Sequence, residues 1–208
     1  MKDLVFQLHT RFNYIDLKYC HLCMDNKQKL MDLCGKETGW DILSHSESEN
    51  KTFFDLNSLI QEYGYISIVF RHISIEGFIN DIAIRYIDKD KFDVESDKTR
   101  FVDKIEKVYN LVSNKPFPRD KTIYQNLQDL NSVRNTLVHM KSGKICLDDL
   151  FDSTVKVNDK FNSLINQIIG NKKSKVSKQK DYLKVVEETK SLYDDLGLLF
   201  YEEIPKGN

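Results

Sequence analysis

Between residues 131 and 139 the chain carries an arginine, two amides and a histidine at helical spacing. Asn131 and Asn135 are four residues apart, and so are Asn135 and His139, which places all three along one side of a helix. Arg134 precedes Asn135 directly. Arginine stays charged and its planar fork fits phosphate oxygens, whereas histidine exchanges a proton near neutral pH. These residue types could act on a phosphodiester, with histidine as base or acid and arginine as the cation for the developing negative charge.

The arginine of this segment falls on its apolar side. Leu127, Leu130, Leu137 and Val138 form one arc at about 100° per residue, and Arg134 lies inside that arc. Amphipathic packing alone gives no reason for a guanidinium there. Arginine is also rare in the chain, so Arg134 stands out as the one that the sequence places on an apolar helical face.

The stretch 130–139, LNSVRNTLVH, resembles the RNxxxH form of the Rx4–6H motif of HEPN (higher eukaryotes and prokaryotes nucleotide-binding) domains. The stretch 75–80, IEGFIN, is similar to the acidic and aromatic segment that many of these domains carry on an earlier core helix. The resemblance covers about residues 52–170. It implies an all-α fold, an antiparallel HEPN-like helical bundle with extra N-terminal and C-terminal helices.

The resemblance also implies a metal-independent endoribonuclease that cleaves RNA through attack of the ribose 2′-hydroxyl, without a cofactor. Arg134, His139 and Asn135 would be catalytic, and two copies of the motif would meet in a homodimer. Glu76, Asn80, Asn131 and Lys141 would form a second shell or bind substrate. The family setting is that of a toxin or phage-defence effector, with an antitoxin or defence protein as a possible partner.

Two other interpretations stay open for these residues. Arg134 could pair with Glu76 inside the bundle while His139 caps its helix, or the chain could be a non-catalytic HEPN scaffold that binds nucleotide, RNA or a partner protein. One departure concerns the branch of the family paired with a nucleotidyltransferase antitoxin, which has tyrosine two positions after the motif histidine. This chain has Lys141 there; it could contact RNA phosphates or complement the helix dipole.

The elements that must position these residues are helices. Apolar residues recur every three or four positions in six stretches; we expect helices over about 3 to the low thirties, 53–88, 101–112, 120–140, 148–169 and from about 181. Pro116 and Pro118 should stop the third helix, and Gly77 should mark a close helix contact or a bend. The lysine-rich stretch 171–180 is expected to be a linker. We therefore predict one helical domain over 1–208, with a HEPN-like core at 52–170 and a linker and C-terminal helix at 171–208.

The amino-acid composition limits the classes of protein to which the chain can belong. The chain has 208 residues, of which 40% are hydrophobic and 30% charged, with a formal net charge of −1. This balance fits a globular domain and argues against a basic protein that coats nucleic acid. We find no apolar run long enough to cross a membrane and expect a cytoplasmic protein. Cys20 and Cys23 have the spacing of a zinc half-site, but no second pair follows, so core thiols are favoured.

Overall fold

The computed structural model describes residues 2–34, 46–138 and 182–204. All regular secondary structure in these ranges is helical, as predicted: α1 (Lys2–Cys34), α3 (Glu47–Tyr86), α4 (Phe101–Ser113), α5 (Thr122–Val138), α8 (Tyr182–Glu188) and α9 (Leu192–Glu203). The expected helix over 148–169 and the linker over 171–180 lie outside the described residues, and so do His139 and Lys141.

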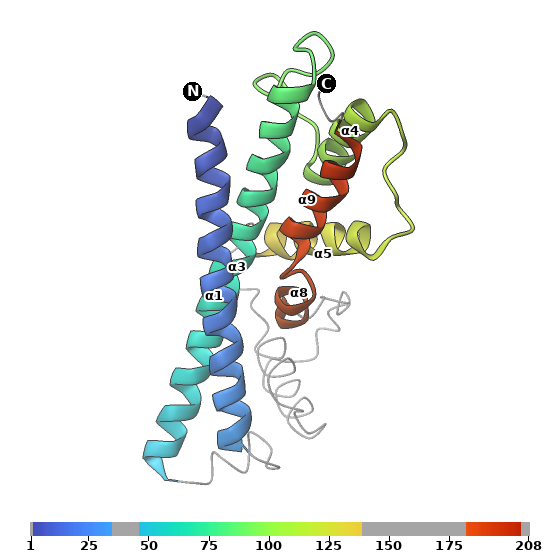
Figure 1. The fold of residues 1–208 in the computed structure, drawn as a ribbon. Helices are drawn as coiled ribbons and strands as arrows, with labels where there is room; N and C mark the ends of the chain where they lie inside the picture. Colours follow the sequence, from blue (N-terminus) through green and yellow to red (C-terminus); the bar gives the residue numbers. More distant parts are fainter. Residues whose placement is uncertain (1, 35–45, 139–181, 205–208) are drawn as a thin grey trace, which may run out of the picture.

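The two longest helices, α1 and α3, form an antiparallel pair along most of their length (Figure 1). Aromatic side chains meet across the pair, with ring centroids 5.7 Å apart for Phe12 and Phe70. Gly77 allows the closest approach, because a Cβ at this position would lie 2.9 Å from the Cβ of His9. The predicted close helix contact at Gly77 is therefore confirmed.

The shorter helices pack against one side of this pair. In Figure 1, α4 and α9 lie beside the C-terminal half of α3, and α5 crosses their direction. Phe200 of α9 is fully buried and packs edge-on against Tyr109 of α4 and Phe78 of α3, at centroid distances of 5.4 Å and 5.9 Å. One apolar core thus joins segments from both ends of the described chain. None of the described helices is long and apolar enough to cross a membrane.

Local signals explain most helix boundaries. Helix α4 ends at Ser113, where Asn114 adopts a left-handed conformation (φ 55°) and its N–H donates to the carbonyl of Asn110. Asparagine tolerates this conformation, and Pro116 follows where a helix could not continue. The loop over residues 88–98 is also as predicted.

The prediction of a single last helix is wrong. The chain forms two helices there, α8 and α9, and residues 189–191 break the helical run between them. The hydroxyl of Thr189 donates to the carbonyl of Val185 at 2.7 Å and accepts a hydrogen bond from Arg71 Nη1 at 2.6 Å. A contact with a residue more than a hundred positions away thus lies at this break, and helical periodicity alone does not predict it.

Candidate functional site

The C-terminal half of α5 presents a strip of three connected polar side chains. Arg134 Nη1 donates a hydrogen bond of 3.0 Å to Asn135 Oδ1, and Asn135 Nδ2 donates one of 3.3 Å to Asn131 Oδ1. All three residues are half-buried. We call Asn131, Arg134 and Asn135 the α5 strip. It orients the guanidinium along the edge of the helix.

The α5 strip lies where α5 leaves the core. Leu127, Leu130 and Val133 are buried, whereas Val138 is 51% exposed. The prediction that Val138 belongs to the apolar side of this helix is wrong, and Val133 is buried in the core instead. Arg134 consequently lies at the border between core and solvent. His139 and Lys141 would follow at the end of this helix, but both lie outside the described residues.

Glu76 of α3 pairs with a lysine that the sequence analysis did not consider. Lys104 Nζ of α4 lies 3.3 Å from Glu76 Oε1 and 3.7 Å from Asp97 Oδ2. The side chain of Lys104 is only 9% exposed. The ion pair between Arg134 and Glu76 that one interpretation required is not formed, because Lys104 is the cation on Glu76.

His72 lies one helical turn before Glu76 on α3. The residue is 4% exposed, and its ring stacks on Phe101 with centroids 3.8 Å apart. The pKa of His72 is lowered from 6.5 to about 4, first by burial and then by the positive charge of Arg134, and Glu76 and Asn131 partly oppose these effects. His72 is uncharged at neutral pH.

Neither ring nitrogen of His72 has a hydrogen-bond partner of normal geometry among the described residues. The amide of Asn131 lies close enough to affect the pKa without meeting the geometric limits of a hydrogen bond. The sequence does contain a signal for this residue, since His72 and Glu76 are four positions apart and share a helix face. Lys104 follows Phe101 by three positions, so the angular argument used for α5 would have placed it beside the buried face of α4.

Asn80 is not joined to the α5 strip. It lies one turn beyond Glu76, and its Oδ1 is buried without a hydrogen-bond partner in the described part of the chain. Of the seven predicted site residues, the structure therefore brings Asn131, Arg134 and Asn135 into direct contact, whereas Glu76 pairs with Lys104 of α4. Asn80 stays apart, and two residues are not described.

Among the described residues, no carboxylate pairs with the charge of Arg134. Arg71, Arg85 and Arg119 pair with Asp16, Asp81 and Glu106 at 2.8, 2.8 and 2.6 Å. Within the described ranges, the hydrogen bond of Arg134 to a side chain goes to the neutral amide of Asn135. A half-buried guanidinium of this kind keeps both its charge and N–H donors for an anion.

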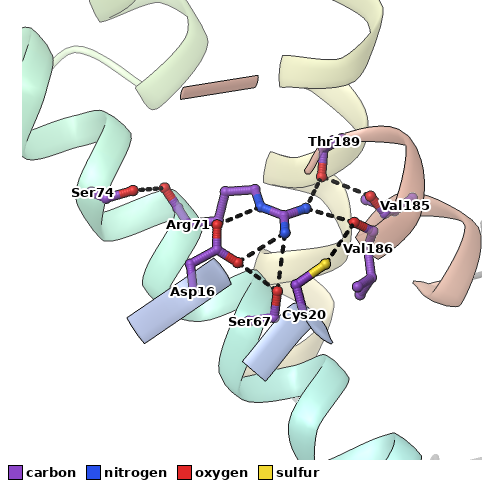
Figure 2. A network of polar contacts seen from close by, with 8 residues as sticks. All are labelled: Asp16, Cys20, Ser67, Arg71, Ser74, Val185, Val186 and Thr189. Carbon is purple, nitrogen blue, oxygen red and sulfur yellow. Dashed lines mark hydrogen bonds and ion pairs between the residues drawn. The ribbon is translucent and has the colours of Figure 1, made fainter. Parts of the chain in front are cut away.

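The sequence analysis missed a second arginine centre, in which Arg71 of α3 is fully buried. Figure 2 shows its guanidinium between α1, α3 and α8. Nε and Nη2 donate to the two carboxylate oxygens of Asp16 at 2.8 Å each, and Nη2 also donates to Ser67 at 3.1 Å. Nη1 donates to Val186 O at 2.8 Å and to Thr189 Oγ1 at 2.6 Å.

These contacts use all five N–H donors of Arg71, so nothing remains for a ligand. The centre instead ties α8 to the α1–α3 pair. We expected Arg134 to be the one arginine on an apolar helical face. This is wrong, because Arg71 also lies on such a face and is more deeply buried. Its partners come from segments far apart in the sequence, which no local pattern reveals.

Cys20 and Cys23 of α1 are free thiols buried in the core. Cys23 Sγ donates to the carbonyl of Ile60 at 3.3 Å, and Cys20 Sγ contacts the carbonyl of Val186 at 3.9 Å. Burial raises the pKa of Cys23 to about 12, which disfavours the thiolate that a metal requires. No group of three or more histidine, cysteine or acidic side chains in the described ranges is placed to hold a metal ion.

Comparison of the chain with protein-family models, with curated proteins and with solved structures gives no match.

Proposed function

We propose that this chain is a metal-independent endoribonuclease in which Arg134, Asn135 and His139 act on the scissile phosphodiester, with two copies of the site meeting in a homodimer. Arg134 binds the phosphate and stabilises the charge that develops on its oxygens. His139 acts either as the base toward the ribose 2′-hydroxyl or as the acid toward the departing 5′-oxygen, and His139 of the second copy takes the other role. Asn135 orients the guanidinium. The HEPN-like nature of the bundle belongs to the same proposal.

The observation that supports this proposal most is the state of Arg134. Its side chain is half-buried, is oriented by an amide and has no carboxylate partner among the described residues. An arginine retained only for stability would gain from a carboxylate, as Arg71 does. A guanidinium left with its charge beside an apolar core attracts phosphate more strongly than one in water.

The homodimer follows from the number of proton-transferring groups. The reaction needs a base and an acid, whereas the sequence motif over 130–139 offers one histidine, His139. The nearest described imidazole, His72, is buried under Phe101 and cannot reach an RNA strand. A second copy of the chain would supply the second imidazole.

The test is cleavage of single-stranded RNA and transfer RNA by the purified chain in EDTA. We expect products that end in a 2′,3′-cyclic phosphate, and a loss of about 10²-fold or more in rate for Arg134→Ala and for His139→Ala. Arg119→Ala serves as a matched control, because Arg119 pairs with Glu106 at the surface. Unchanged cleavage by both site variants would reject the proposal.

One outcome would favour the alternative of a non-catalytic scaffold. The near-neutral net charge and the pairing of Glu76 with Lys104 are compatible with a chain that binds RNA or a partner without cutting it. Arg134-dependent binding without product formation would indicate this function. We further propose a toxin or defence setting for the nuclease, which predicts growth arrest on expression, relieved by Arg134→Ala.

A further inference from the structure

Helix α1 has a face that the other described helices leave accessible. In Figure 1 this helix lies at the edge of the molecule, with α3 on one side. A groove follows α1 beside α8, and its lining includes Leu17, His21, Met24, Gln28 and Met31. These residues follow one another in steps of four and three, the spacing of the a and d positions of a coiled coil. Helix α1 therefore presents a seam on which a second helix can pack.

This α1 seam has exposed apolar side chains at both of its ends. Tyr14, the a position before Leu17, is 71% exposed, and Met31 is 50% exposed. Leu17 and Met24 lie between them and are half-buried. Large apolar side chains that stay accessible along one stripe are typical of a contact surface. Methionine adapts its shape to a partner and packs well against aromatic rings.

A row of charged residues runs along the outer edge of the α1 seam: Arg11, Lys18, Asp25 and Asp32. They are seven positions apart, which is the e position of each heptad, where charges set the choice and orientation of the partner helix. All four side chains are exposed, and the ion pair that α1 forms with α8 uses Lys27 instead. Along the helix, two positive charges are followed by two negative charges.

This order of signs is complementary to its own reverse. In an antiparallel pair of α1 helices, Lys18 lies opposite the partner's Asp25, and Arg11 lies opposite the partner's Asp32. A two-fold axis near residue 22 forms each of these pairs twice. A parallel pair would instead place each charge beside an identical one, which is unfavourable. The charges therefore favour a second copy of the same helix in the opposite direction.

We propose that two copies of this chain associate through their α1 seams, with the two helices antiparallel. The partner is a second copy because the seam matches its own reverse in two respects. Its charges pair with opposite charges, and Tyr14 lies opposite the partner's Met31 in the same register. Residues 11–32 would be in contact over about 33 Å. The inference names the surface of a homodimer and does not rest on the ribonuclease activity.

Sedimentation equilibrium of the full chain measures this association, and we expect a monomer–dimer equilibrium at micromolar concentrations. Lys18→Asp and Asp25→Lys should each weaken the dimer about tenfold at low salt, because one substitution places like charges opposite each other twice. The double variant Lys18→Asp/Asp25→Lys should regain the affinity of the parent, and an equimolar mixture of the two single variants should associate too. Lys29→Asp is the matched control, since this exposed lysine of α1 lies outside the seam.

A second variant tests the apolar part of the seam. Met31→Glu should weaken the dimer about tenfold or more, because the new carboxylate would lose water on contact with the partner's Tyr14. Leu198→Glu is its control, since Leu198 of α9 is 67% exposed and does not line the groove. Circular dichroism checks that each variant folds as the parent does.

Carbodiimide cross-linking determines the orientation of the two helices. The reagent joins an amine directly to a carboxylate, so it links only groups in contact. In a mixture of unlabelled and isotope-labelled chains, we expect mass spectrometry to find mixed peptide pairs that join Lys18 to the partner's Asp25. A parallel arrangement would keep these two groups apart.

The outcomes decide between this surface and others. A chain that stays monomeric overturns the inference, as does a dimer that both single charge variants leave unchanged or whose double variant stays as weak as the single ones. Links between the copies that never involve α1 also overturn it. A dimer that responds to the charge exchange supports the inference whatever the chain does to RNA. Such a dimer without RNA cleavage would reject the proposed function alone, so the two proposals fail separately.

Discussion

Two arginines of this chain lie against the same core and have opposite surroundings. Arg71 is fully buried and donates all five N–H groups to oxygens of α1, α3 and α8. Arg134 is half-buried, and its side-chain partner in the described ranges is a neutral amide. Burial therefore does not separate a structural arginine from a binding one. What separates them is whether the chain itself satisfies the charge and the donors.

The largest effect should come from Arg71→Met. This change leaves Asp16 buried without its cation, so the free energy of unfolding should fall by about 3–5 kcal/mol. Urea unfolding followed by circular dichroism measures the loss. In the control, Asp16→Leu/Arg71→Met removes both charges and should recover most of the stability. A single variant as stable as the parent would show that the centre in Figure 2 does not hold α8 in place.

The second effect is the pH dependence of the free energy of unfolding that arises from His72. The pKa of His72 is lowered from 6.5 to about 4, so the folded chain binds this proton less tightly than the unfolded chain. The stability that His72 contributes in its uncharged form is fully present above about pH 6.5 and is lost as pH falls toward 4. The free energy of unfolding should decrease by up to about 3 kcal/mol over this window because of His72.

Urea unfolding between pH 7 and 4 measures this decrease. His72→Phe should flatten the dependence, although the part due to His9 stays, since burial lowers the pKa of that residue too. His21→Phe is the control, because His21 is exposed on α1. An equal pH dependence in the parent and in His72→Phe would contradict the uncharged state that we assign to His72.

A smaller effect should separate two threonines that use their hydroxyls in the same way. Thr189 donates to the carbonyl of Val185 and Thr136 to that of Ser132, but Thr189 also accepts from Arg71. Thr189→Val should lower the free energy of unfolding by about 1–2 kcal/mol, because a buried donor of Arg71 loses its acceptor. Thr136→Val changes an exposed site and should stay within about 0.5 kcal/mol. Equal losses at both sites would remove the distinction between the two regions.

The smallest effect on stability should come from Arg134→Ala. This residue has no ion pair among the described residues, so the free energy of unfolding should change by less than about 0.5 kcal/mol while RNA cleavage is lost. Thermal unfolding of the same preparation used for the cleavage assay checks both statements. A loss as large as that of Arg71→Met would make Arg134 a second structural centre.

Most of the helices were predictable because each buries one face at a regular interval. The apolar period located α1, α3, α4 and α5 within a few residues, although α3 begins at Glu47, before its first apolar residue, Phe53. The break between α8 and α9 was not predictable. At this break Thr189 accepts a hydrogen bond from Arg71, a contact across more than a hundred positions that no local pattern predicts.

The candidate site was predictable in part for the same reason. Asn131, Arg134 and Asn135 share one helix, so their spacing alone predicted that they meet. The partner of Glu76 was missed because Lys104 lies on another helix. Opposite charges on different helices can pair in several ways, and the packing of α3 against α4 decides which pair forms.

The Arg71 centre also has a consequence that we expect for the order of folding. The residue is synthesised more than a hundred positions before Val186 and Thr189. Until those residues emerge from the ribosome, α1 and α3 can pair, but one nitrogen of the guanidinium lacks its acceptors. Contacts of such long sequence separation slow folding, because the intervening chain must first be brought to order. We therefore expect α8 to dock onto the α1–α3 pair late in folding.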